Sequence, residues 1–177
     1  MDHSSYPHSV LIVDDDPMVL ATLKVSLATE PYEVVVCSSA IQALTLLPDQ
    51  DFAVIVSDHR MPKMMGLDFL VECRQVRPHA ARILLTAVLQ FATAVDAINR
   101  GEICRFIAKP WLRTELVAAI RDGIQRHDLA LHNQTLQAEA IALNEQLLAA
   151  NRELKARVDA LERQRALAEP DKALTSR

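Results

Sequence analysis

Asp58 is the residue whose position most directly suggests chemistry. It follows the apolar residues 54–56 and Ser57, and it precedes a turn that contains Met61 and Pro62. A β-branched run of this kind predicts a buried strand, and the carboxyl ends of such strands carry the functional groups in parallel α/β sheets. A single Asp at a strand end is more often a cap of a turn or helix. Asp58 is therefore a candidate functional residue only if other predicted strands also end in reactive polar residues.

A second predicted strand, residues 10–13, also ends in acids, namely Asp14, Asp15 and Asp16, followed by Pro17. The last of these suits a helix N-terminus, where an acid complements the helix dipole and proline is favoured in the first turn. Two further adjacent carboxylates raise each other's pKa unless a cation neutralises them. Asp14 and Asp15 therefore predict a site for a hard divalent cation.

Two more predicted strands end in polar groups that suit phosphoryl chemistry. Residues 82–87 contain Thr86 near their end, and residues 105–111 contain Lys109. Because parallel strands all place their carboxyl ends on one edge, side chains far apart in sequence should converge there. Carboxylates, a hydroxyl and a lysine together predict joint binding of a divalent metal and a phosphoryl group. The converging set is Asp14, Asp15, Asp58, Thr86 and Lys109.

Helices are expected between these strands, because apolar residues recur there at helical spacing. Five strands alternating with five helices predict an α/β fold with a doubly wound, five-stranded parallel sheet. The strands are expected at residues 10–13, 33–37, 54–58, 82–87 and 105–111, and the helices at 18–28, 40–47, 66–76, 91–99 and 112–124.

Composition narrows the function classes. The chain has 177 residues, 50% of them apolar and only 3 of them glycine, which predicts one packed domain with an appendage. A net charge of -4 gives no basic surface for direct nucleic-acid binding. Three widely spaced cysteines are typical of buried thiols in a reducing compartment, and no apolar run is long enough to span a membrane. We therefore expect a cytoplasmic protein.

The combined motifs resemble the receiver domains of two-component response regulators. The resemblance covers residues 9–126 and rests on residues 13–17, on Asp58 with Met61, Pro62 and Gly66, on residues 85–87, and on Lys109 with Pro110. It implies the flavodoxin-like strand order 2-1-3-4-5, magnesium as cofactor and a histidine kinase as phosphoryl donor. It also implies no enzymatic activity beyond the protein's own phosphorylation and dephosphorylation.

The resemblance assigns a role to each matching position. Asp58 would be the phosphoacceptor, Lys109 would pair with the phosphoryl oxygens, and Thr86 and Phe106 would act as the switch residues. The implied metal ligands are Asp15, Asp14, Asp58 and the backbone carbonyl of Arg60. Met65 departs from the family pattern, which commonly has Asp or Asn before the glycine, so the conformation of that loop is open. Strand alternation points His59 away from Asp58, as a surface residue.

Residues 127–168 differ in composition, since they lack glycine and proline and repeat leucine every seven residues. This pattern predicts a coiled-coil dimerisation helix, with a solvated single helix as the alternative. The d positions would be Leu147, Leu154 and Leu161, and the a positions Asn144, Asn151 and Val158; asparagine at a favours a parallel two-stranded coil. Residues 1–9 would form a polar N-terminal tail, residues 10–126 the receiver and residues 169–177 a flexible tail.

Two classes of function stay open: a phosphorylation-controlled signalling protein whose receiver governs the helical dimerisation segment, and a phosphohydrolase. Asp14-x-Asp16 resembles the nucleophile motif of haloacid-dehalogenase-like phosphohydrolases, which would make Asp14 the nucleophile but would leave Asp58 unexplained. The residues around Lys109 resemble receivers that are fused to an output domain, such as a cyclic-di-GMP enzyme or an ATPase transcription activator. We therefore expect an output domain outside this sequence, with the chain as a regulatory part of a longer protein.

Overall fold

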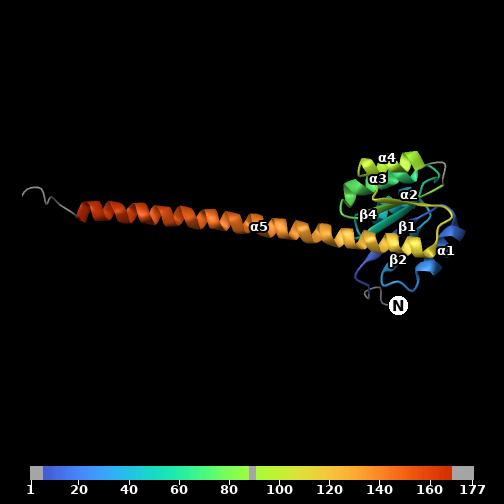
Figure 1. Cartoon of the computed structure of the whole chain (residues 1–177), viewed down its shortest axis with the longest axis horizontal. Coiled ribbons are helices and arrows are strands. Elements are labelled where there is room, and N and C mark those ends of the chain that lie inside the picture. Colours follow the sequence, from blue (N-terminus) through green and yellow to red (C-terminus); the bar gives the residue numbers. More distant parts are fainter. Residues whose placement is uncertain (1–5, 88–90, 169–177) are drawn as a thin grey trace, which may run out of the picture. The chain divides into compact units, whose positions relative to one another are not determined.

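The computed structural model describes residues 6–87 and 91–168. The chain divides into two units, one ending at Leu131 and the other beginning at His132. The first unit holds a five-stranded sheet with helices on both faces (Figure 1). In chain order the elements are β1 (Ser9–Val13), α1 (Pro17–Leu27), β2 (Glu33–Cys37), α2 (Ala40–Leu46), β3 (Val54–Asp58), α3 (Gly66–Val76), β4 (Ala81–Thr86), α4 (Phe91–Asn99), β5 (Arg105–Ala108) and α5 (Arg113–Ala168).

The sheet is parallel throughout, in the order β2-β1-β3-β4-β5, which confirms the predicted fold and strand order. Its strands are buried on both faces, because successive side chains point to opposite sides. In β1, Val10 and Ile12 pack with α1 and α5, whereas Leu11 and Val13 pack with α2, α3 and α4. The two layers of core fix the strand register, and with it the positions of the strand ends.

Local sequence explains where the helices begin and end. Asp16 caps α1, because its carboxylate accepts a hydrogen bond of 2.8 Å from the backbone N–H of Met18, and Pro17 is the first helical residue. Ser39 caps α2 in the same way. Gly101 follows α4 with a φ of 68°, a left-handed conformation that glycine adopts without strain. The helix-capping interpretation of Asp16 is thus confirmed.

A charge cluster fastens the start of α5 to the loop before β2. The carboxylate of Glu30 accepts hydrogen bonds from Arg113 at 2.9 Å and from Arg121 at 2.8 Å. Arg113 also donates to the backbone carbonyl of Ser26 at 2.7 Å. The Glu30 side chain is 6% exposed, and its contacts with the two arginines offset the loss of its hydration.

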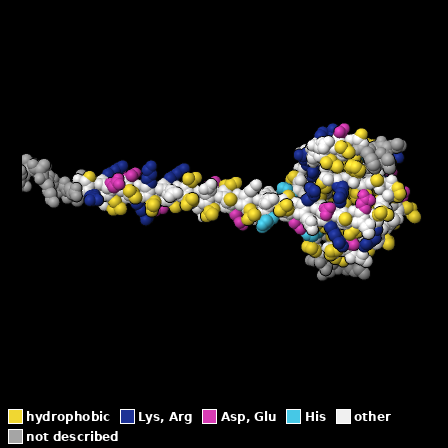
Figure 2. Space-filling view, viewed as in Figure 1, with side chains coloured by type: hydrophobic (Ala, Val, Ile, Leu, Met, Phe, Trp, Pro, Cys, Tyr) yellow, Lys and Arg dark blue, Asp and Glu magenta, His cyan; other side chains and the backbone are white. Residues whose placement is uncertain are grey.

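The helix α5 begins against the sheet, where Leu116 and Ile120 are fully buried. Gly123 approaches the sheet so closely that a Cβ at its position would lie 2.9 Å from Val54 Cγ2. In the second unit every side chain described is exposed, and hydrophobic side chains alternate along the helix with charged ones (Figure 2). No helix in the described residues is long and apolar enough to cross a membrane. The expected tail at 169–177 and residues 1–5 lie outside the described residues.

Candidate functional site

Three strand ends place charged side chains in direct contact at the carboxyl edge of the sheet. Asp58 is the last residue of β3, Asp14 directly follows β1, and Lys109 directly follows β5. The ammonium nitrogen of Lys109 lies 2.9 Å from Asp14 Oδ2 and 2.5 Å from Asp58 Oδ1. The side chains of Asp14 and Asp58 are only 2% and 11% exposed. The predicted convergence of these three residues is therefore present in the structure.

Backbone N–H groups orient both carboxylates. The N–H of Arg60 donates to Asp58 Oδ2 at 2.7 Å, and the N–H of Asp16 donates to Asp14 Oδ1 at 2.9 Å. Each carboxylate thus meets a backbone donor with one oxygen and Lys109 with the other. Charge-assisted hydrogen bonds of this kind are stronger than neutral ones, so the two acids are held in defined orientations.

Lys109 is the one cation in contact with these two acids among the described residues. Burial lowers the pKa of its ammonium group, but hydrogen bonds to Asp58 and Asp14 outweigh that effect and raise the pKa above its usual value. The lysine therefore keeps its charge near neutral pH. Its ammonium nitrogen also lies 5.8 Å from the centroid of the Trp111 ring, which is within the range of a cation–π interaction.

Thr86 and Phe106 lie on the two neighbouring strands β4 and β5. Thr86 is 1% exposed at the end of β4, and its hydroxyl donates to the carbonyl of Ala87 at 3.3 Å. The backbone N–H of Lys109 donates to the carbonyl of Thr86 at 2.8 Å, so threonine and lysine are linked through their backbones. Phe106 is partly buried against the core shared by α2, α3 and α4.

Asp15 takes a different position from its neighbour. It is exposed, and its carboxylate makes no hydrogen bond or ion pair with the described residues. A pocket of about 170 Å³ opens beside the acceptor, lined by Asp58, His59, Arg60, Ala87 and Lys109. Three carboxylates and one lysine at this edge of the sheet leave an excess of negative charge. That donor set fits a hard cation such as Mg²⁺, which prefers oxygen ligands and retains several waters.

A family model for the response regulator receiver domain matches residues 10–121, more than half of the 177 residues. The chain belongs to this receiver-domain family. The receiver is 34% identical over 123 residues to the transcriptional regulatory protein GlrR of Escherichia coli K12, covering 70% of this chain and 28% of GlrR. HoxA of Cupriavidus necator, a hydrogenase transcriptional regulatory protein, is 32% identical over 121 residues, with 68% and 25% covered. The chain thus spans about a quarter of the length of these relatives.

Solved structures agree with this membership. A receiver domain protein from Clostridium thermocellum has a TM-score of 0.66 and 30% identity, covering 70% of this chain and 98% of that one. A structure described as adenylate cyclase from Rhodopirellula baltica has a TM-score of 0.71 and 36% identity, with 73% and 96% covered. The receiver interpretation is confirmed, and the phosphohydrolase alternative is not favoured, since Asp14 is buried in its contacts with Lys109 and the Asp16 N–H.

In the loop after the acceptor, one expectation needs correction and one open point has an answer. His59 is only 8% exposed rather than a surface residue, because helices cover both faces of the sheet and a side chain that points away from Asp58 is therefore not exposed. Its Nδ1 atom is buried without a hydrogen-bond partner. The left-handed residue of the loop is Lys63, with a φ of 69°, whereas Met65 has an extended conformation before α3. The apolar Met65 is therefore unstrained.

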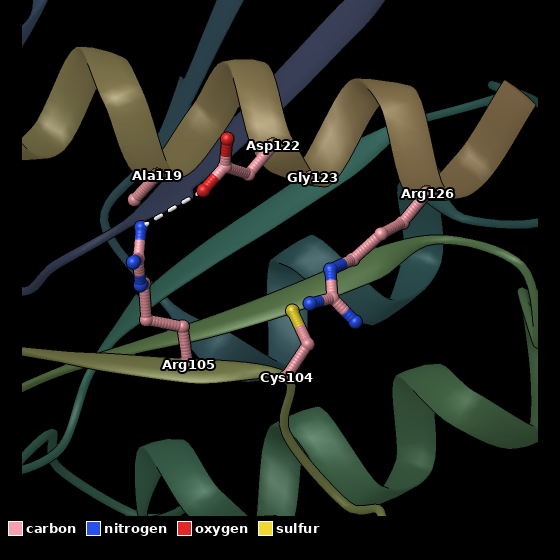
Figure 3. A pocket seen from close by; sticks show the side chains of 6 residues that line it. All are labelled: Cys104, Arg105, Ala119, Asp122, Gly123 and Arg126. Atoms are coloured by element: carbon pink, nitrogen blue, oxygen red, sulfur yellow. Dashed lines mark hydrogen bonds and ion pairs between the residues drawn. The ribbon is translucent and has the colours of Figure 1, made fainter.

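A second, smaller pocket of the receiver lies between β5 and α5 (Figure 3). It encloses about 60 Å³, and an ion pair of 3.2 Å between Arg105 and Asp122 spans it. Its one thiol, Cys104, donates to the carbonyl of Arg82 at 3.0 Å, and burial raises the pKa of that thiol. Neutral thiols are poor nucleophiles, so this pocket does not compete with the carboxyl edge as a reactive site.

Proposed function

We propose that the chain is the phosphorylation-controlled part of a two-component response regulator, with Asp58 as the phosphoacceptor. The observation that carries this proposal is the double contact of Lys109 with Asp58 and Asp14 beside an open pocket. The charged ammonium group of Lys109 thus lies next to the carboxylate of Asp58, which a phosphoryl donor can reach through the pocket. The proposed donor is the phosphohistidine of a histidine kinase.

In the proposed reaction, one carboxylate oxygen of Asp58 attacks the phosphorus in line with the leaving nitrogen of the donor. An oxygen–phosphorus bond forms, the phosphorus–nitrogen bond breaks, and its electron pair stays on the departing imidazole. Lys109 moves from the carboxylate to a phosphoryl oxygen and keeps its proton, in line with its raised pKa. The product is an acyl phosphate on Asp58.

Asp14, Asp15, Asp58 and the backbone carbonyl of Arg60 would hold the magnesium ion in this proposal. When bound there, Mg²⁺ supplies neutralisation of the phosphoryl oxygens. The exposed position of Asp15 suits this role, because its carboxylate is committed to no other partner among the described residues. The buried Asp14 would then serve both the ion and Lys109.

The proposed switch uses Thr86 and Phe106. A phosphoryl group on Asp58 brings acceptor oxygens to the edge where Thr86 ends β4. The hydroxyl now directed at the carbonyl of Ala87 would turn to the phosphoryl group, and Phe106 would move into the space that this vacates. A few kcal/mol of differential contact is enough to invert the population of two such states.

The acceptor assignment is tested by incubating the chain with acetyl phosphate and Mg²⁺ and locating the label by mass spectrometry. We expect one phosphoryl group, on Asp58, and no labelling of Asp58→Asn. Asp16→Asn is a matched control, because Asp16 also lies at this edge but only caps α1. Full labelling of Asp58→Asn together with loss of labelling in Asp14→Asn would instead support the phosphohydrolase reading.

We also propose that the C-terminal part of α5 pairs with a second copy of the chain. The d-position leucines Leu147, Leu154 and Leu161 are 57%, 63% and 64% exposed in the single chain. Asn151 and Val158 would occupy a positions of the same seam. A helix with such a row of exposed leucines gains free energy by burying it against an identical row. In a regulator longer than this chain, the parallel pair would transmit the phosphorylation state of the receiver to an output domain.

Sedimentation of the full chain tests the dimer. The double variant Leu147→Asp with Leu154→Asp buries two carboxylates in the seam, which costs several kcal/mol, about enough to dissociate the pair. The variant Ala149→Asp with Ala156→Asp adds the same charge on the opposite face of the heptad and should remain dimeric. A wild-type chain that sediments as a monomer at tens of micromolar, or a leucine variant as dimeric as the alanine variant, contradicts the dimer.

A further inference from the structure

A cluster of two histidines and one aspartate lies at the edge of the sheet opposite to Asp58. His8 directly precedes β1, and His127 and Asp128 are consecutive residues of α5. Their three ligand atoms lie within 4.8 Å of one another, and no other set of three His, Cys, Asp or Glu side chains is this close among the described residues. The receiver chemistry makes no use of this cluster.

The distances from the Asp128 carboxylate to the two imidazoles are close to those between metal ligands. Asp128 contacts His8 Nε2 at 3.4 Å with one carboxylate oxygen and His127 Nδ1 at 3.3 Å with the other. In a tetrahedral zinc site with bonds of about 2.0–2.2 Å, neighbouring donor atoms are roughly 3.4 Å apart. The two imidazole rings stand nearly perpendicular, at 86°, with centroids 6.3 Å apart, so they are not stacked face to face.

The backbone on both sides of the cluster is held by the sheet. The carbonyl of His8 accepts a hydrogen bond of 2.9 Å from the N–H of Glu33, at the start of β2. On α5, Ile124 packs on the core one turn before His127, whose side chain is only 7% exposed. Ligands held by a rigid scaffold lose little freedom on binding an ion.

The cluster is nevertheless open to solvent on one side. The side chain of Asp128 is 50% exposed, and that of His8 is 24% exposed. His8 also lines a surface depression of about 540 Å³ together with Tyr32, Arg121 and Gln125, among others. An ion can enter from this side, and water can fill the position that three protein ligands leave free.

We propose that His8, His127 and Asp128 bind a Zn²⁺ ion, which joins the residues before β1 to α5. Two imidazole nitrogens and one carboxylate are a donor set that zinc favours, whereas magnesium prefers oxygen ligands alone. The site is separate from the phosphoacceptor edge, and the proposal does not depend on the proposed function. Its effect is to fasten α5 to the sheet close to the end of the first unit at Leu131.

The test is calorimetric titration of the untagged full chain with Zn²⁺ in a large excess of Mg²⁺, followed by thermal unfolding with and without Zn²⁺. The variants His8→Ala, His127→Gln and Asp128→Asn each remove one ligand. Removal of an outer-shell partner already weakens metal sites about 10- to 100-fold, so loss of a ligand should weaken binding at least about tenfold. His79→Ala removes a histidine elsewhere, and Asp15→Asn removes a carboxylate of the phosphoacceptor edge.

We expect one equivalent of Zn²⁺ in the wild type and in both controls, with a rise of the unfolding temperature that the three ligand variants lose. Co²⁺ in place of Zn²⁺ should give the visible absorption of a four-coordinate ion in the wild type. The three ligand variants should lack this absorption. His8→Ala and Asp128→Asn change partly exposed side chains, so they remain informative if His127→Gln fails to fold. No zinc uptake by the wild type, equal uptake by the ligand variants, or loss of uptake in Asp15→Asn alone overturns the proposal.

Discussion

Gly66 is the residue at which a single methyl group should damage both stability and the acceptor. It begins α3 directly behind the end of β3. A Cβ built at this position would lie 1.7 Å from the backbone oxygen of Asp58 and 2.8 Å from Ser57 Oγ. Because the nearest atom belongs to the backbone of the acceptor itself, a side-chain rotation cannot relieve the clash. Gly66→Ala must displace either the start of α3 or Asp58.

The expected cost follows from that displacement. Overpacking of a core by one methyl group typically costs about 1–3 kcal/mol, and here the backbone must move by more than an ångström to restore normal contact. We therefore expect Gly66→Ala to lower the free energy of unfolding by about 3 kcal/mol or more. Gly101→Ala is the control: its left-handed φ makes alanine cost about 1 kcal/mol, but the nearest atom to its Cβ would be 3.9 Å away.

Urea unfolding and phosphorylation by acetyl phosphate measure the two effects separately. Gly66→Ala should be less stable than Gly101→Ala, and its folded fraction should be labelled more slowly, because Asp58 no longer holds its contacts with Lys109 and the Arg60 N–H. Gly101→Ala should be labelled at the wild-type rate. If Gly66→Ala unfolds at the wild-type urea concentration and is labelled normally, the close approach of Gly66 to Asp58 does not constrain the acceptor.

Two further predictions concern the proposed switch residue Thr86 and the buried thiol of Cys73. Thr86→Ala should be phosphorylated on Asp58 as the wild type is. It should lose the phosphorylation-dependent change in fluorescence of Trp111, which is the sole tryptophan and lies near Lys109. A fluorescence response equal to that of the wild type would contradict this. Burial raises the pKa of Cys73 to about 12 from 9.0, so its contribution to stability is complete below pH 9 and falls as the pH rises towards 12. Over that range the free energy of unfolding, measured in urea, should fall less steeply with pH in Cys73→Ala than in the wild type, by about 1.4 kcal/mol per pH unit. An equally steep fall in both proteins would show that burial does not raise the pKa of this thiol.

The strand ends could be predicted from sequence because each depends on local pattern. Runs rich in β-branched residues end close to where the structure ends β1 and β3, so the sequence pattern alone predicts Asp14 and Asp58 at the carboxyl edge of the sheet. Lys109 followed from the same reasoning, since parallel strands share one edge. The position of each acid relative to the lysine then depended only on strand order.

Contacts between distant residues could not be predicted in this way. The pairing of Glu30 with Arg113 and Arg121 joins positions more than 80 residues apart, and no spacing in the sequence marks it. The cluster of His8 with Asp128 is hidden for the same reason. Alternation along β3 predicts only which face of the sheet His59 is on, and it cannot tell that this face is also covered, so His59 is buried rather than exposed.

The charge cluster around Glu30 has a consequence for how this sequence can diverge. Arg113 and Arg121 are 49% and 62% exposed, so either can regain water when Glu30 is lost. Glu30 is 6% exposed and cannot, so losing the arginines first would strand a buried carboxylate. Among descendants of this chain, the glutamate should therefore be replaced before or together with the arginines, and a lineage that keeps Glu30 should keep a cation at both positions.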